Sequence, residues 1–181
     1  LDGPADIFIK DGKIKTVSND IKPNNHTRVI DATSRYVIPG LIDCHVHLRE
    51  PGLEYKETIE TGSRAAAVGG YTTLICEPNT LPPIDSLEMV ASFMERVNQK
   101  GVVNIYTKAC ITKGLLGEEL TNIAKLATDK RVRALSDDGN PVFYESLMKR
   151  ACELAAQSKL IISPHCEDSQ ISLDKEKTNT N

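Results

Sequence analysis

From residue 41 onward, short apolar runs alternate with longer stretches whose apolar residues recur at helical spacing. The period-2 and period-3.6 patterns predict strands and amphipathic helices, respectively. After an apolar run that leads into His45, the predicted strands cover residues 71–76, 102–111, 132–135 and 160–163. The predicted helices cover residues 57–68, 85–100, 118–128 and 143–158, and their stripes are expected to be core. Strands alternating with helices in this way are typical of a parallel sheet built from βαβ units.

The first 38 residues follow a different pattern and predict a small separate β segment. Residues 6–10 and 13–17 are expected to form two strands joined at Asp11-Gly12, a strong hairpin signal. Residues 28–32 are a further strand candidate. We therefore expect a β segment over residues 1–38, the start of an α/β barrel over 39–168, and a polar, disordered tail over 169–181.

Composition narrows the class without identifying a chemistry. The 181 residues are 40% hydrophobic and 26% charged, with a net charge of -3, as in an ordinary soluble domain. Basic residues do not cluster, so we expect no nucleic-acid partner, and no apolar run is long enough to predict a membrane span. A cytoplasmic enzyme with reduced thiols is the default, because the five cysteines lack a Cys-x-x-Cys spacing. Core packing is favoured over a zinc role for Cys44 and Cys166.

Candidate chemistry begins with His45 and His47. Two residues apart on a strand, they project to the same side, where both imidazoles can bind one cation. The apolar residues before them predict a buried strand and a dry setting, in which a neutral imidazole needs a partner. Solvated or hydrogen-bonded histidines are the alternative, since His-x-His alone is a weak signal. Arg49 follows the strand end, where a guanidinium can hold a carboxylate through two parallel hydrogen bonds.

Three further polar residues follow predicted strands, namely Asn79, Asp138 and His165. In a (β/α) barrel the active site is assembled at the carboxyl ends of the strands, where all of these residues are expected. Each also has an ordinary explanation. Asn79 and the run around Asp138 suit turns, and His165 can pair with neighbouring acidic residues.

Four motifs resemble one family in order: Asp43-Cys44-His45-Val46-His47-Leu48-Arg49-Glu50-Pro51-Gly52; Gly70-Tyr71-Thr72-Thr73 with Pro78-Asn79-Thr80; Ser136-Asp137-Asp138-Gly139; and His165-Cys166-Glu167-Asp168. They are similar to those of the cyclic amidohydrolases, and the Arg-Glu-Pro-Gly ending resembles dihydroorotases in particular. The resemblance implies a (β/α)8 TIM barrel with one or two zinc ions. It implies that His45, His47, Asp138 and His165 are metal ligands, with Asp138 bridging two zinc ions and His165 on the second. Arg49 and Asn79 would hold the substrate carboxylate.

Many relatives bridge the metals with a carboxylated lysine instead, and Lys108 is a distant alternative for that role. The implied reaction is the reversible, zinc-dependent hydrolysis of dihydroorotate to N-carbamoyl-L-aspartate in pyrimidine synthesis. Bound zinc would supply a water of pKa about 7 and polarise the carbonyl. Hydantoinase, dihydropyrimidinase or allantoinase activity and an inactive scaffold role remain alternatives.

Only five of the eight barrel strands are predicted, and a whole barrel typically takes about 250 residues. We therefore expect the remaining C-terminal half of the enzyme, with its proton-shuttle aspartate, to come from another polypeptide, and this chain alone to be inactive. Further partners implied are a second copy of the chain or a transcarbamoylase.

Overall fold

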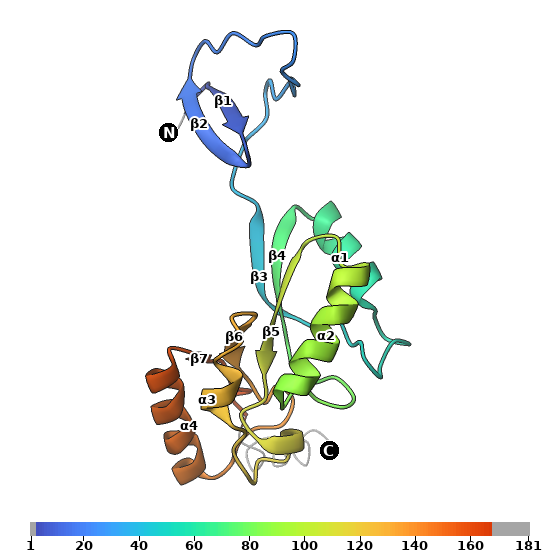
Figure 1. Cartoon of the computed structure of the whole chain (residues 1–181), viewed down its shortest axis with the longest axis vertical. Coiled ribbons are helices and arrows are strands. Elements are labelled where there is room, and N and C mark those ends of the chain that lie inside the picture. The colour runs from blue at the N-terminus through green and yellow to red at the C-terminus, as the bar shows by residue number, and fades with distance from the viewer. Residues whose placement is uncertain (1–2, 168–181) are drawn as a thin grey trace, which may run out of the picture. The chain divides into compact units, whose positions relative to one another are not determined.

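The computed structural model describes residues 3–167, which divide into two compact units, one before and one after the boundary between Pro39 and Gly40 (Figure 1). The predicted polar tail over residues 169–181 lies outside the described residues, as does Asp168 of the last motif. The predicted domain limits stay a prediction.

The N-terminal unit contains one antiparallel hairpin, as predicted. Strands β1 (Asp6–Lys10) and β2 (Lys13–Ser18) pair with Lys10 opposite Lys13. The two residues between them, Asp11 and Gly12, have φ values of 53° and 68°. Positive φ at both central positions is the requirement of the tight turn that matches the twist of paired strands.

The third strand predicted over residues 28–32 is wrong, because these residues form no strand. Val29 and Ile30 are exposed, and no strand of the described residues pairs with them. A β-branched pair favours extended backbone, but a strand needs a partner to take its hydrogen bonds.

The second unit is a five-stranded parallel sheet, and helices lie in the chain connections between successive strands (Figure 1). Its strands pair in the order in which they occur in the chain: β3 (Leu41–Val46), β4 (Tyr71–Cys76), β5 (Asn104–Ala109), β6 (Val132–Leu135) and β7 (Ile161–Ile162). The helices are α1 (Ile59–Val68), α2 (Leu87–Lys100), α3 (Ile123–Leu126) and α4 (Glu145–Ser158), with a 3-10 turn, η1, at Lys113–Leu115. Sequential parallel order is that of a (β/α) barrel, so the predicted class and its five-strand extent are confirmed.

Side-chain caps explain where the first two long helices begin. Thr58 caps α1 through the amide of Thr61, and the Thr61 hydroxyl accepts from the Thr58 amide in return. The cap of α2 is Ser86, so the helix begins two residues later than the predicted start at residue 85. Asp85 accepts a hydrogen bond from the amide of Gly114 at 2.9 Å instead, so it ties η1 to the start of α2.

The helix predicted over residues 118–128 is much shorter than expected. Leu120 forms a bridge with Thr112, and the Thr121 hydroxyl donates to the carbonyl of Cys110 at 2.8 Å. These contacts engage the residues before Asn122 with the segment after β5, so the helix begins only after Asn122, whose side chain caps it. Tertiary hydrogen bonds here override the helical periodicity.

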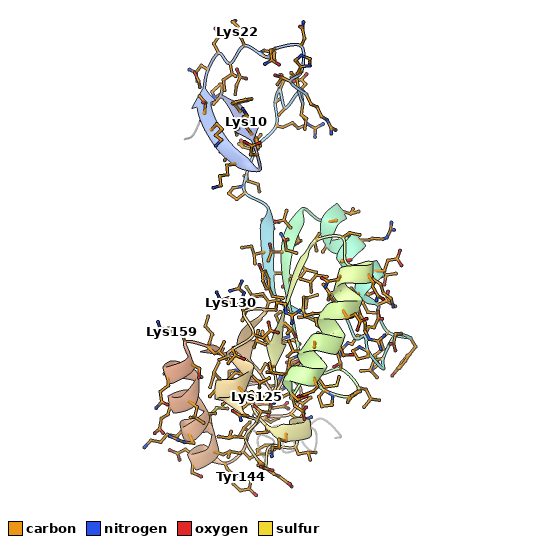
Figure 2. All side chains as sticks on the ribbon, viewed as in Figure 1. Lys10, Lys22, Lys125, Lys130, Tyr144 and Lys159 are labelled. Carbon is orange, nitrogen blue, oxygen red and sulfur yellow. The ribbon has the colours of Figure 1, made fainter. Side chains whose placement is uncertain are left out.

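The core lies between the sheet and its helices, where side chains fill the space in Figure 2. Its largest fully buried members include Leu74, Ile84, Phe93, Ile123 and Leu135. By contrast, β3 is an edge strand among the described residues, and its Leu41 and Ile42 are 41% and 61% exposed. The buried strand predicted before His45 is therefore wrong.

Cys44 and Cys166 are also exposed, so core packing was wrong for both. Cys44 lies on the edge strand β3, which has a neighbouring strand on one side only within the described residues, and Cys166 lies after the last strand. Among residues 3–167, no helix combines the length and hydropathy needed to cross a bilayer.

Candidate metal centre

The carboxyl ends of four strands bring together the polar residues singled out in the sequence. His45 lies in β3 and His47 just after it. Asn79, Asp138 and His165 are each the third residue after a strand, namely β4, β6 and β7. In a parallel sheet these ends share one edge, so residues up to 120 positions apart in the chain become neighbours.

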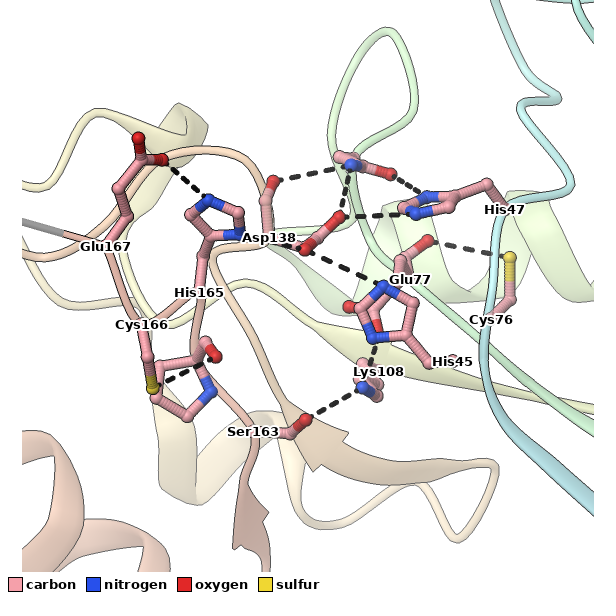
Figure 3. Close-up of polar contacts among 12 residues, drawn as sticks. His45, His47, Cys76, Glu77, Lys108, Asp138, Ser163, His165, Cys166 and Glu167 are labelled. Carbon is pink, nitrogen blue, oxygen red and sulfur yellow. Dashed lines mark hydrogen bonds and ion pairs between the residues drawn. The ribbon is translucent and has the colours of Figure 1, made fainter. Parts of the chain in front are cut away.

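Asp138 is the centre of this group (Figure 3). Its Oδ2 lies 3.4 Å from His47 Nε2, and its Oδ1 lies 3.7 Å from His45 Nε2. The Nδ1 atom of His165 lies 3.4 Å from the same Oδ1. The structure thus brings all four predicted ligands together around one carboxylate.

The two strand histidines direct the same ring nitrogen, Nε2, toward Asp138. His47 Nδ1 lies 3.0 Å from Asn79 Oδ1, while Asn79 Nδ2 donates to Asp138 Oδ2 at 3.0 Å. Because Asn79 uses its donor on Asp138, its oxygen faces His47, and the His47 Nδ1 carries the proton of that hydrogen bond. His45 Nδ1 faces a carboxylate oxygen of Glu77 at 3.2 Å. In the tautomer with its proton on Nδ1, each ring has a lone pair on Nε2 available beside Asp138.

The donor set suits a metal ion. Ligand atoms of His45, His47 and Asp138 all lie within 4.8 Å of one another. Two ligands of a tetrahedral zinc with bonds of about 2.1 Å are separated by about 3.4 Å, close to the distances from Asp138 to its histidines. The site is less dry than expected, since the His45 side chain is 57% exposed.

Asp137 and Asp138 have different surroundings although they are neighbours in the chain. Asp137 is fully buried, and its carboxylate accepts from the amides of Ile111 at 2.7 Å and Thr112 at 3.1 Å, and from the Thr112 hydroxyl. Burial raises the pKa of Asp137, against the opposing effect of these hydrogen bonds. Asp137 therefore holds the segment after β5 against the turn that presents Asp138.

The segment after β3 carries Arg49 on backbone with a φ of 60°. Within the described residues the Arg49 guanidinium makes no hydrogen bond or ion pair, so it is available to an anionic ligand. The next residue, Glu50, is 1% exposed and accepts from Lys100 at 2.5 Å and from the amide of Ile59 at 3.2 Å. Glu50 thus anchors the Arg49 segment to the start of α1 and the end of α2.

Asn79, predicted to hold substrate, has its side chain engaged by His47 and Asp138. Its substrate role stays a prediction, as do the ligand roles of the four clustered residues.

His165 has a second carboxylate partner in Glu167, whose Oε2 lies 2.8 Å from His165 Nε2. This hydrogen bond, with a smaller effect of Asp138, raises the pKa of His165. The Nδ1 atom is left facing Asp138. His165 therefore combines both arrangements considered from the sequence. It pairs with a neighbouring acidic residue, Glu167, and it lies in the cluster around Asp138.

Sequence reasoning missed the role of a polar group beside His45, formed by the buried Glu77 and Lys108 and the half-buried Ser163 (Figure 3). A lysine inside the apolar strand β5 and a glutamate directly after β4 were the signals that could have identified it. Lys108, the alternative bridging lysine, is engaged by Glu77 and Ser163. Nearby, burial raises the pKa of the Cys76 thiol to about 12, so this thiol is a poor ligand near neutral pH.

Comparison with known proteins identifies relatives over most of the chain. A family model described as "Dihydro-orotase-like" matches residues 34–177. A dihydroorotase of Thermoanaerobacter sp. (strain X514) is 48% identical over 169 residues, which make up 93% of this chain and 38% of that protein. A dihydroorotase of Aquifex aeolicus is 43% identical over 171 residues, with 94% of this chain and 40% of that protein covered. The chain thus spans about two fifths of the length of these curated relatives.

The solved structures compared with the chain are those of hydantoinases. An L-hydantoinase (dihydropyrimidinase) from Arthrobacter aurescens matches with a TM-score of 0.82 and 25% identity, over 98% of this chain and 41% of that one. A D-hydantoinase matches with a TM-score of 0.73 and 27% identity, over 90% of this chain and 36% of that one.

Proposed function

The chain belongs to the dihydroorotase-like family, and we propose that it contributes the metal-binding part of a dihydroorotase, which interconverts dihydroorotate and N-carbamoyl-L-aspartate. The observation that carries the proposal is the convergence of His45, His47, Asp138 and His165 from separate strands. Identity of 41–48% to relatives named dihydroorotase supports this substrate over those of the hydantoinases, which match at 25–27% in the two structures compared.

Zinc is the proposed metal, because imidazole nitrogens and a carboxylate oxygen are its usual ligands in catalytic sites. His45, His47 and Asp138 would hold one ion, and Asp138 together with His165 would hold a second. When bound, the metal activates a water molecule and polarises the amide carbonyl.

The residues of the chain divide the remaining work. Asp138 lies together with the histidine nitrogens around one point, and Arg49, whose guanidinium makes no hydrogen bond or ion pair among residues 3–167, binds the substrate carboxylate. Asn79 fixes His47 and Asp138 and would also bind that carboxylate. Hydrolysis adds water across the ring amide. The oxygen joins the carbonyl carbon, the carbon-nitrogen bond breaks and the nitrogen takes a proton. The proton carrier is an aspartate expected outside this chain.

The remaining barrel strands are supplied by a C-terminal segment equivalent to the rest of the relatives, of which this chain covers 38–40% in the examples above. The enzyme works in the cytoplasm on small charged substrates. A homo-oligomer and a complex with a transcarbamoylase are the assemblies to test, by light scattering and co-purification.

A hydantoinase-type activity is the second candidate, favoured by the similarity to the L-hydantoinase structure. Arg49 separates the two candidates, because dihydroorotate carries a carboxylate and hydantoin does not. Rates with dihydroorotate, hydantoin and allantoin, measured together with metal content by plasma emission on the chain with and without its C-terminal complement, test the proposal. Metal bound together with a preference for dihydroorotate supports it. A preference for hydantoin, or a folded complex without metal, would overturn it.

A further inference from the structure

A buried ion pair, Glu77 with Lys108, lies beside His45 (Figure 3). The Lys108 ammonium contacts Glu77 Oε1, and the same oxygen lies 3.2 Å from His45 Nδ1. We infer that Glu77 and Lys108 form a positioning pair that orients His45 and selects the ring tautomer with its proton on Nδ1. Neither residue lies among the four clustered ligands, so each acts through His45 rather than on substrate.

One oxygen of Glu77, Oε1, contacts both Lys108 and His45. Its Oε2 is buried and has no hydrogen-bond partner among the described residues, so Oε1 takes the lysine and the histidine together. An ionised carboxylate only accepts hydrogen bonds, so the His45 nitrogen that faces it must carry the proton. The Nε2 atom is then unprotonated and directed toward Asp138. Metal-binding histidines generally donate their second ring N–H to a carboxylate or carbonyl in this way.

Burial explains why Glu77, the acceptor for His45, is paired with Lys108. Glu77 is fully buried at its side chain, and Lys108 is 3% exposed. A lone carboxylate in this place would be an uncompensated buried charge, which is strongly destabilising. The pair gives His45 a strong acceptor while adding no net charge beside the proposed metal.

Lys108 has one further contact, to Ser163 Oγ at 3.0 Å. Ser163 follows β7 and lies two residues before His165. Contacts from His45 through Glu77 and Lys108 to Ser163 therefore connect β3, β4, β5 and the segment after β7 beneath the site. The orientation of one proposed ligand is thus linked to the segment that carries another.

The inference rests on the proposed metal site, and its test separates the acceptor from the ion pair. Two double variants, Glu77→Gln/Lys108→Met and Glu77→Met/Lys108→Met, both remove the buried charges and have similar volumes. Only glutamine keeps an oxygen that can accept from His45. Affinity for Co²⁺ is titrated against a chelator on the chain together with its C-terminal complement. In the glutamine variant this affinity is expected to stay near that of the unsubstituted protein. In the methionine variant it is expected to fall about 10- to 100-fold. Equal affinities of the two variants would overturn the inference.

A spectroscopic measurement on the unsubstituted, metal-free protein requires no variant to fold. Long-range proton–nitrogen correlations should show His45 protonated on Nδ1, and this signal should be lost in the methionine double variant. A proton on His45 Nε2, or none on either nitrogen, would contradict the inference. Thr107→Val is the matched control. It removes a buried hydroxyl on the same strand that, within residues 3–167, bonds only to the Lys108 carbonyl, and Co²⁺ affinity should not change.

The two proposals fail in different ways. If the unsubstituted protein binds no Co²⁺ or Zn²⁺, the metal site of the proposed function is wrong, and the inference falls with it. If that protein binds metal and hydrolyses dihydroorotate while the two double variants bind Co²⁺ equally, only the inference is wrong.

Discussion

Asp137 and Asp138 are consecutive, yet one is a buried structural acceptor and the other faces three histidines. Asp137 Oδ1 receives the Ile111 amide at 2.7 Å, whereas Asp138 Oδ2 lies 3.4 Å from His47 Nε2. The same substitution should therefore affect metal binding at Asp138 and folding stability at Asp137.

We predict that Asp138→Asn lowers metal content sharply without lowering the stability of the metal-free protein, because it removes a proposed ligand carboxylate. Asp137→Asn should leave metal per folded molecule unchanged but lower the free energy of unfolding by about 1–3 kcal/mol, since its new amide group would face backbone N–H donors. Plasma emission and urea unfolding measure the two effects. Loss of metal in the Asp137 variant alone would reverse the assignment.

Arg49→Ala should raise KM for dihydroorotate about 10- to 100-fold, the value of one or two hydrogen bonds to a charged group. Metal content should stay the same, because Arg49 is not among the clustered ligands. Arg64→Ala, which removes an exposed pair with Glu60 on α1, is the control and should leave KM unchanged. Metal loss with normal KM in the Arg49 variant would refute its substrate role.

Glu50→Gln should both destabilise the protein and raise KM. The buried carboxylate accepts from Lys100 and from the Ile59 amide, so its neutral replacement weakens two contacts that anchor the Arg49 segment. A loss of about 1–3 kcal/mol in the free energy of unfolding is expected. Glu54→Gln, at an exposed position of the same loop, is the matched control. Unchanged stability and KM in the Glu50 variant would show that the segment does not depend on this anchor.

Asp129 makes stability depend on pH through Arg131. The hydrogen bond from the Arg131 side chain lowers the pKa of Asp129 below its ordinary value of 3.8. A lowered folded-state pKa stabilises the fold at pH values above the unfolded-state pKa, and this contribution is lost as pH falls through the folded-state pKa.

Asp129→Asn should therefore cost about 0.5–1 kcal/mol at pH 7, a modest value because Arg131 is 43% exposed, and the difference should vanish in strong acid. Urea unfolding at a series of pH values measures it. Glu153→Gln, which removes the exposed pair with Arg150, should show almost no change. A cost that persists below pH 3 would show that the charge of Asp129 is not its source.

Local chemistry was enough to predict the elements whose geometry depends on adjacent residues. The Asp11-Gly12 turn requires positive φ at two neighbouring positions, and both residues accept it at low cost. The strands β4 and β6 and the helices α1, α2 and α4 follow from apolar periodicity, because burial of one face stabilises them wherever they pack. The motif residues could be placed at strand ends for the same reason, and parallel order then implied their convergence.

The tertiary structure decided what depends on residues far apart in the chain. Strand formation over 28–32 and helix formation over 118–121 failed because partners elsewhere, or their absence among the described residues, outweighed local preference. Asp137 and Asp138 have the same chemistry and differ only in the direction that the turn after β6 gives each side chain. Glu77 and Lys108 are 31 residues apart, and only the pairing of β4 with β5 makes them one buried ion pair, because a charge can be buried only where folding supplies its counter-charge.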